Sequence, residues 1–270
     1  MTATVTDYAA IWDYGSQPRS QSITCNLCGH FETEEDRRPP GGWTEPDRYG
    51  YQVGVVVCAE CELIYLNPRM AFEAYASFYE SGAYRSLVSA YHGREINAET
   101  IQPEQERYAV EVADFLEPHV KHPRSLLDVG GSTGVVAKYM KERFGVESSV
   151  LDPAGRETDE ALRNGLPIIR GTAESFDPDG YRWGIILVCQ TIDHLLDPMG
   201  VLKKLHGCLA DDGLLFVDIL DFDKTREIKI DHPYNFTEKT MALFLSKAGY
   251  REIARERAPD GVHVRFLCAR

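Results

Sequence analysis

Short apolar runs and amphipathic segments alternate through the second half of the chain. The apolar runs predict seven strands, at residues 125–129, 149–151, 167–170, 185–189, 214–220, 251–256 and 262–269. Segments with helical periodicity, each stopped by a glycine, lie among them at residues 135–144, 157–164, 197–212 and 237–248. Strands that alternate with helices predict an α/β domain whose mostly parallel sheet carries helices on both faces.

The first half of the chain lacks this alternation. A β-rich run at 51–57 and an apolar run at 63–66 precede aromatic residues at three- and four-residue spacing over 71–90, which predicts a helix. A second helix is predicted at 104–116. These changes of pattern divide the chain into an N-terminal lead at 1–21, a small module at 22–66, a helical linker or lid at 67–123 and the α/β domain at 124–270.

Composition and charge narrow the class of protein. The 270 residues include 42 acidic and 29 basic side chains, and the formal charge of −13 argues against nucleic acid, which is bound through clustered Lys and Arg. No apolar run approaches the ~20 residues of a membrane span, and residues 1–21 lack a signal-peptide pattern. We therefore expect a cytoplasmic protein with neither a nucleic-acid nor a membrane partner. The sequence leaves homodimer formation open.

Four of the seven cysteines form two CxxC pairs, Cys25 with Cys28 and Cys58 with Cys61. In a chain without a secretion signal, such pairs indicate a metal site in preference to disulfides. Four thiolates suit a tetrahedral Zn²⁺ and leave no open coordination position, so we expect a structural zinc ion. Two buried thiol pairs or a redox dithiol are the alternatives, and His30 fits less well as a ligand than the symmetrical cysteine pairs.

The segment with the most chemical information joins the first strand of the α/β domain to the following helix. Its sequence is LLDVGGSTG, residues 126–134. Glycines there allow positive φ and close approach of a ligand to the backbone, and the helix N-terminus offers free N–H groups. The spacing of Gly130, Gly131 and Gly134 does not fit the G-x-G-x-x-G fingerprint, which argues against an NAD-linked oxidoreductase. An adenosine-bearing ligand is the better expectation.

This segment resembles the first motif of the class I S-adenosylmethionine (SAM)-dependent methyltransferases, which is roughly apolar-apolar-Asp-x-Gly-x-Gly-x-Gly. Asp128, Gly130 and Gly134 match the motif, and Ser132 replaces its middle glycine. The resemblance implies a Rossmann-like sheet whose last strand is antiparallel. It also places the amino-acid part of SAM against Asp128 and the backbone of Gly130, Gly131 and Ser132.

Later segments extend the resemblance over residues 124–270. Asp152 matches the acidic residue that binds the ribose hydroxyls of SAM in this family, and residues 171–174 match the stretch that contacts adenine, with Thr172 in place of the common Asp. In relatives, the end of the fourth strand lies near the methyl group. The resemblance therefore implies SAM as cofactor, S-adenosylhomocysteine (SAH) as product, and further contacts from Pro153, Thr172, Ala173, Glu174, Cys189 and Gln190.

Methyl transfer needs a nucleophile that is aligned with the methyl carbon and has lost its proton. Ligands of open α/β sheets bind at the carboxyl ends of the strands, where we expect His194 and His232 on loops. Either histidine is a candidate base, with Asp193 and Tyr234 as orienting or binding partners. The alternatives are structural: His194 packs a helix start, and His232 caps loop backbone.

The module and the segment after it resemble a bacterial arrangement in which a four-cysteine, zinc-ribbon-like module precedes a class I methyltransferase domain, often in sugar or secondary-metabolite modification. Cys58 to Cys61 and the following Asn67-Pro68-Arg69 carry this likeness. The sequence thus predicts an enzyme that moves a methyl group from SAM to an O, C or N atom of a small molecule, a sugar or secondary-metabolite intermediate. Two alternatives stay open: an RNA methyltransferase whose zinc module binds the substrate, and a non-catalytic SAM-binding interaction protein.

Overall fold

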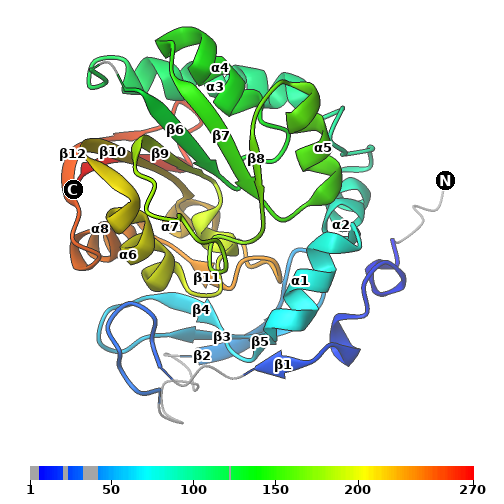
Figure 1. Cartoon of the computed structure of the whole chain (residues 1–270). Coiled ribbons are helices and arrows are strands. Elements are labelled where there is room, and N and C mark those ends of the chain that lie inside the picture. The colour runs from blue at the N-terminus through cyan, green and yellow to red at the C-terminus, as the bar shows by residue number, and fades with distance from the viewer. Residues whose placement is uncertain (1–5, 21–23, 33–41, 122) are drawn as a thin grey trace.

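A computed structural model of the chain describes residues 6–20, 24–32, 42–121 and 123–270 (Figure 1). Its largest part is a seven-stranded sheet in the order β12-β13-β10-β9-β6-β7-β8. The strands are β6 (Ser125–Val129), β7 (Glu147–Asp152), β8 (Ile168–Arg170), β9 (Trp183–Cys189), β10 (Leu209–Leu220), β12 (Arg251–Arg257) and β13 (His263–Ala269). Strand β13 runs antiparallel to both its neighbours, and the pairs from β10 to β8 are parallel, which confirms the predicted class of sheet.

Helices cover both faces of this sheet because successive strand side chains point to opposite sides. On one face, Leu126 packs with α3 (Gln102–Leu116), α4 (Val135–Phe144) and α5 (Gly155–Arg163). On the other face, Leu127 packs with α6 (Pro198–Cys208) and α8 (Glu238–Lys247). The fully apolar strand interiors found in the sequence are therefore the middle layer of a three-layer domain.

The prediction of a helix at 197–212 is wrong about where the helix ends. Helix α6 stops at Cys208, and β10 begins at the next residue, five positions before the predicted strand start at Leu214. The pairing of β10 with β9 shifts register between Leu209 and Leu214, so the intervening polar residues lie in an irregular part of the strand. The charged residues Asp211 and Asp212 interrupt the apolar run, so the hydrophobic pattern alone did not indicate where this strand begins.

A smaller, four-stranded sheet has the order β11-β4-β3-β2 (Figure 1). Three strands come from the N-terminal module: β2 (Gly42–Pro46), β3 (Gln52–Val57) and β4 (Ile64–Leu66). The fourth, β11 (Tyr234–Asn235), comes from the α/β domain and pairs antiparallel with β4. Module and domain therefore share a sheet.

Two helices follow the module, where the sequence predicts one. They are α1 (Phe72–Glu80) and α2 (Ala83–His92), and Gly82 breaks the helical path with φ 79°. The short strand β1 (Arg19–Ser20) pairs with β5 (Arg69–Met70), and Trp12 stacks against Phe78 of α1 with ring centroids 5.2 Å apart. The described part of the lead thus packs against its own chain. A short helix, α7 (Phe222–Thr225), was not predicted.

None of the helices among the described residues has the length and apolar character that crossing a membrane requires.

Gly134→Ala should destabilise the fold by about 1–3 kcal/mol. Gly134 has φ +74°, and an added Cβ would lie 2.5 Å from Cδ1 of Leu166. Gly207→Ala in α6 is the matched control: its Cβ would meet nothing within 4 Å, and alanine favours a helix, so stability should not fall. Urea unfolding of both variants measures the difference. Equal stability of the two would contradict the backbone constraint at Gly134.

Candidate functional site

A cavity of about 1380 Å³ opens at the carboxyl ends of the parallel strands, with α1 and α2 on its other side. It is lined by eleven of the twelve residues that the sequence assigns to SAM: Asp128, Gly130, Gly131, Ser132, Asp152, Pro153, Thr172, Ala173, Glu174, Cys189 and Gln190. The twelfth, Gly134, precedes α4 and lies outside the lining. The structure therefore brings together residues that lie more than sixty positions apart in the sequence.

The loop after β6 keeps the conformation that its glycines predict. Gly130 and Gly134 have φ +72° and +74°, and Ser132 adopts φ +51° although it is not glycine. A Cβ on Gly130 would lie 2.4 Å from Oγ1 of Thr191. The departure from the family motif at Ser132 therefore leaves the backbone path in the left-handed region.

Two buried carboxyls border this loop. Asp128 is 1% exposed, and neither of its oxygens makes a hydrogen bond of ordinary geometry with the described residues. Asp152 accepts hydrogen bonds from the backbone N–H groups of Ser132 (3.0 Å) and Ala154 (2.8 Å). Burial raises the pKa of Asp128 to about 7 and that of Asp152 to about 6. The backbone N–H of Ala137, in the first turn of α4, is the donor nearest to Asp128 and offsets a small part of this rise in its pKa. A buried acceptor without a good hydrogen bond is costly, so this arrangement fits a ligand that brings an ammonium group and hydroxyls.

The candidate histidines meet beside the same cavity. Asp193 and His194 lie in the 3-10 turn η3 (Ile192–His194) after β9, and His232 precedes β11. The two imidazole rings are 4.6 Å apart between centroids, and Nδ1 of His232 lies 3.1 Å from Oδ2 of Asp193. The hydroxyl of Tyr79, from α1, lies 2.7 Å from Nδ1 of His194. Three segments of the chain thus form one polar cluster.

The members of this cluster differ in their access to the cavity. His194 lines it, whereas Asp193 and His232 are buried behind His194. Burial, with Lys229 as the next cause, holds the pKa of His232 well below its usual value, which favours the neutral ring. Tyr234 lies in the core on β11, outside the cavity lining, with its hydroxyl 3.4 Å from the carbonyl oxygen of Leu196.

Asp231 also belongs to this cluster, and the sequence interpretation missed it. Its carbonyl oxygen lies 3.0 Å from Nδ1 of His194, and Oδ2 lies 3.6 Å from Nε2 of His232. Oδ1 is buried without a hydrogen-bond partner among the described residues. The sequence did carry a signal, because the dipeptide Asp-His occurs after both the fourth and fifth strands, at 193–194 and 231–232.

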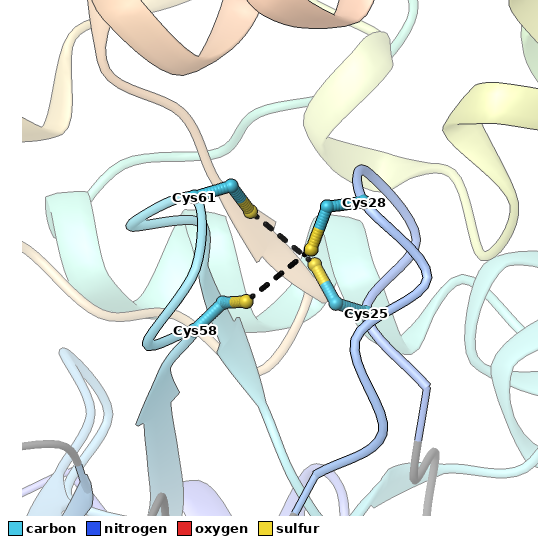
Figure 2. Close-up of side chains that lie close together, drawn as sticks. All are labelled: Cys25, Cys28, Cys58 and Cys61. Atoms are coloured by element: carbon cyan, nitrogen blue, oxygen red, sulfur yellow. Dashed lines mark hydrogen bonds between the residues drawn. The ribbon is translucent and has the colours of Figure 1, made fainter.

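The four cysteines of the module converge on one point (Figure 2). Sγ of Cys25 lies 3.5 Å from Sγ of Cys61, and Sγ of Cys28 lies 3.6 Å from Sγ of Cys58; all four atoms fall within 4.8 Å of one another. The thiols are free, and Zn–S bonds of about 2.3 Å in a tetrahedron would put the sulfurs about 3.8 Å apart. The donor set and spacing therefore fit a four-thiolate zinc site.

The two knuckles that present these cysteines have the same backbone pattern. The N–H of Gly29 donates to the carbonyl of Cys25, and the N–H of Glu62 donates to the carbonyl of Cys58, each at 2.9 Å. The carbonyl oxygen of His30 accepts from the N–H of Cys25. His30 therefore supports the first knuckle through its backbone.

The module also contacts both segments that carry the histidines. The N–H of Leu66 donates to the carbonyl oxygen of Pro233 at 2.9 Å, next to His232. The side chain of Asn26, between the first two cysteines, donates to Asp197 at 2.8 Å and accepts from the N–H of Met199 at 2.9 Å. These contacts fix the start of α6, shortly after His194. The cysteine module is thus a structural support of the site.

The family model described as "Methyltransferase domain" matches residues 101–257. Among solved structures, the chain is similar to the plantazolicin methyltransferase BpumL in complex with SAH, with 13% identity, a TM-score of 0.56, and coverage of 72% of this chain and 93% of that one. It is also similar to a SAM-dependent methyltransferase of Thermotoga maritima, a possible histamine N-methyltransferase (20% identity, TM-score 0.51, 61% and 90% covered).

A third similar structure is DesVI of Streptomyces venezuelae, at 16% identity and a TM-score of 0.52, with 61% of this chain and 91% of that chain covered. At these identities the likeness shows the fold. No curated protein matches the chain. The family match covers more than half of the 270 residues and spans the glycine-rich loop, both Asp-His dipeptides and most of the cavity lining.

Because the carboxyl of Asp128 is buried, the free energy of unfolding should decrease as the pH rises from 5 to 8. Its folded pKa of about 7 exceeds the usual 3.8, so the folded state must lose a proton that the unfolded chain has already lost by pH 5. Its stabilising contribution is complete below pH 3.8 and disappears as pH rises through 7. Between pH 5 and 8 we expect a loss of about 2–3 kcal/mol from this group.

Urea unfolding at pH 5 and pH 8 measures this loss, with Asp128→Asn as the comparison. The variant has no proton to lose at this position, so the free energy of unfolding should depend less on pH than in the wild type. Identical pH dependence in the two proteins would show that the burial of Asp128 does not act as described.

Proposed function

The chain belongs to the methyltransferase-domain family and is a methyltransferase, and from this premise we propose that it transfers a methyl group from SAM to an O, C or N atom of a small molecule. One observation carries the proposal: the buried carboxylate of Asp128 and the imidazole of His194 line the same cavity. The first can bind the donor, and the second can take a proton from the acceptor.

Different residues of the cavity would hold different parts of SAM. When bound, SAM supplies an electrophilic methyl group. The buried oxygens of Asp128 are suited to the ammonium of its amino-acid part. Asp152, held in place by two backbone N–H groups, has an orientation suited to the ribose hydroxyls. The side chains near adenine would come from the loop after β8, where Thr172 and Ala173 line the cavity.

His194 is the proposed base because it is the histidine of the cluster that faces the cavity. The hydroxyl of Tyr79 and the carbonyl oxygen of Asp231 both contact Nδ1 of His194. Its Nε2 is therefore left for the acceptor. His232 and Asp193, which lie behind it with Nδ1 and Oδ2 3.1 Å apart, act as positioning residues in this proposal. Tyr234 contributes by anchoring β11, the strand that follows His232.

The acceptor in this proposal is a sugar or secondary-metabolite intermediate. Two observations support a small molecule: the site is a cavity of about 1380 Å³, and the charge of −13 disfavours an RNA backbone. One of the similar structures, BpumL, is named as the methyltransferase of plantazolicin.

We also propose that the four cysteines hold a structural Zn²⁺. The fit of their sulfur positions to a thiolate tetrahedron supports this ion, and four thiolates leave it no open position for substrate. The zinc would tie the 25–28 knuckle to the 58–61 knuckle and so hold β4 against β11. Thiolates of this kind persist in a reducing compartment, which agrees with a cytoplasmic location.

Replacing His194 should abolish turnover and spare SAM binding. His194→Gln removes the base, and we expect kcat to fall about 10²–10⁴-fold, with a smaller fall for His232→Gln. His206→Gln is the control, because that ring lies outside the cavity lining and meets Tyr250 edge-to-face, with centroids 5.1 Å apart. Transfer of labelled methyl from SAM to a panel of hydroxylated and amino small molecules, with RNA as a separate arm, is the assay.

Full activity of His194→Gln on an accepted small molecule would refute the base assignment. Methylation of RNA alone would refute the acceptor class and favour a nucleic-acid substrate.

The purified chain should contain one zinc per molecule, and the variant Cys58→Ser/Cys61→Ser should contain none. We expect this variant to lose kcat more than SAM affinity, because the module supports the histidine segments and not the SAM edge of the sheet. Cys208→Ala, at a thiol away from the cluster, is the control and should retain the metal. Elemental analysis by mass spectrometry and SAM titration measure both effects.

Metal-free protein with normal activity would contradict the structural role of zinc. Two metal ions per chain would instead assign a second ion to Asp193, His194 and His232, whose donor atoms also lie within 4.8 Å of one another.

A further inference from the structure

One cationic side chain reaches the glycine-rich loop from outside the α/β domain. Arg85 lies on α2, before the segment that the family model matches. Its Nη2 donates to Oγ of Ser132 at 3.3 Å, and its Nε donates to Oε1 of Glu157 at 2.9 Å. The side chain is 27% exposed and lines the cavity beside Gly131 and Asp152. Neither the sequence motifs nor the family match assigns it a role.

Without Arg85, the charged side chains that border the loop 130–134 would be acidic. The amino-acid end of SAM carries an ammonium and a carboxylate about 3 Å apart, and Asp128 supplies the acceptor for the ammonium. Three arginines line the cavity, Arg85, Arg156 and Arg163; of these, Arg85 alone has a hydrogen bond to the loop 130–134 among the described residues. A carboxylate beside buried Asp128 and Asp152 needs such a local cation, because both aspartates repel it.

We propose that Arg85 binds the carboxylate of the methionine part of SAM. The guanidinium presents a planar set of donors that matches a carboxylate, and Glu157 holds it from the other side. The weak 3.3 Å contact with Ser132 is the one that the carboxylate would share or replace, while the 2.9 Å ion pair with Glu157 remains. The inference rests on the proposed use of SAM and adds the group that recognises its carboxylate.

This assignment gives α2 a function in specificity. Asp128 and Asp152 are assigned to the ammonium and the ribose hydroxyls of SAM, which decarboxylated SAM also has, so these two aspartates cannot tell the two ligands apart. Decarboxylated SAM carries one more positive charge, and a protein with a formal charge of −13 would attract it more strongly at long range. A preference for SAM therefore depends on groups that bind its carboxylate, and Arg85 is the cation placed at the loop to do so.

Calorimetric titration of the full-length, zinc-loaded protein with SAM and with decarboxylated SAM tests the proposal. We expect the wild type to bind SAM roughly 10–100-fold more tightly, the range for a charge-assisted pair. Arg85→Gln should lose about this factor for SAM and keep its affinity for decarboxylated SAM. Arg163→Gln removes the same charge from an exposed position at the cavity rim and should keep the preference.

Arg85→Lys keeps the charge without the planar fork and should be intermediate, and thermal melts establish that each variant is folded. Equal affinity of the wild type for the two ligands would overturn the proposal. So would an equal loss of both ligands in Arg85→Gln, since that result would make Arg85 a support of α2 alone. A wild type that binds neither ligand, nor SAH, would refute the proposed function itself.

Discussion

The site depends on the antiparallel pairing of β4 with β11. Tyr65 pairs with Tyr234 and Ile64 with Asn235, so a segment of the α/β domain completes the sheet of the cysteine module. This pairing fixes the backbone directly after His232, and Asp47 of the module accepts a hydrogen bond from the N–H of Ile230 just before it. The module and the domain cannot move apart without displacing the histidine cluster. The cysteine module, whose four cysteines lie outside the cavity lining, therefore constrains the geometry of the site.

Buried carboxyls set the chemical character of the cavity and of the cluster behind it. Asp128, Asp193 and Asp231 each have at least one buried oxygen that makes no hydrogen bond of ordinary geometry with the described residues. Such groups oppose folding, and they concentrate where a ligand or a proton has to be received. Some of the acidic residues behind the formal charge of −13 are thus the buried aspartates of the site. Arg85, which contacts the glycine-rich loop through Ser132, is a cation placed beside it.

Local patterns predicted the α/β domain well. The strand at 125–129 and the helix at 135–144 have the predicted bounds, because an apolar strand, a glycine turn and an amphipathic helix are each encoded within a few residues. The family motif indicated the residues proposed to contact SAM, and eleven of the twelve line one cavity at the sheet edge. The cysteine cluster was predictable because paired CxxC spacing leaves few arrangements of four sulfurs.

Contacts between distant segments could not be predicted in this way. Nothing local to residues 64–66 indicates that they pair with β11, and Arg85 sits in an amphipathic helix whose partner, Glu157, lies 72 residues away. The same holds for Tyr79, which looked like one aromatic of a packing stripe and contacts His194. Asp231 was the exception, since the repeated Asp-His dipeptide pointed to it.

The central claim is that SAM binds between the glycine-rich loop of the sheet and helix α2. Hydrogen–deuterium exchange of the zinc-loaded protein, with and without SAH, tests this most directly. The account predicts slower exchange in the ligand complex at residues 130–134 and throughout α2 (Ala83–His92), with little change in the α8 segment on the far face of the sheet. Protection of neither region, or protection confined to the cysteine module, would contradict it.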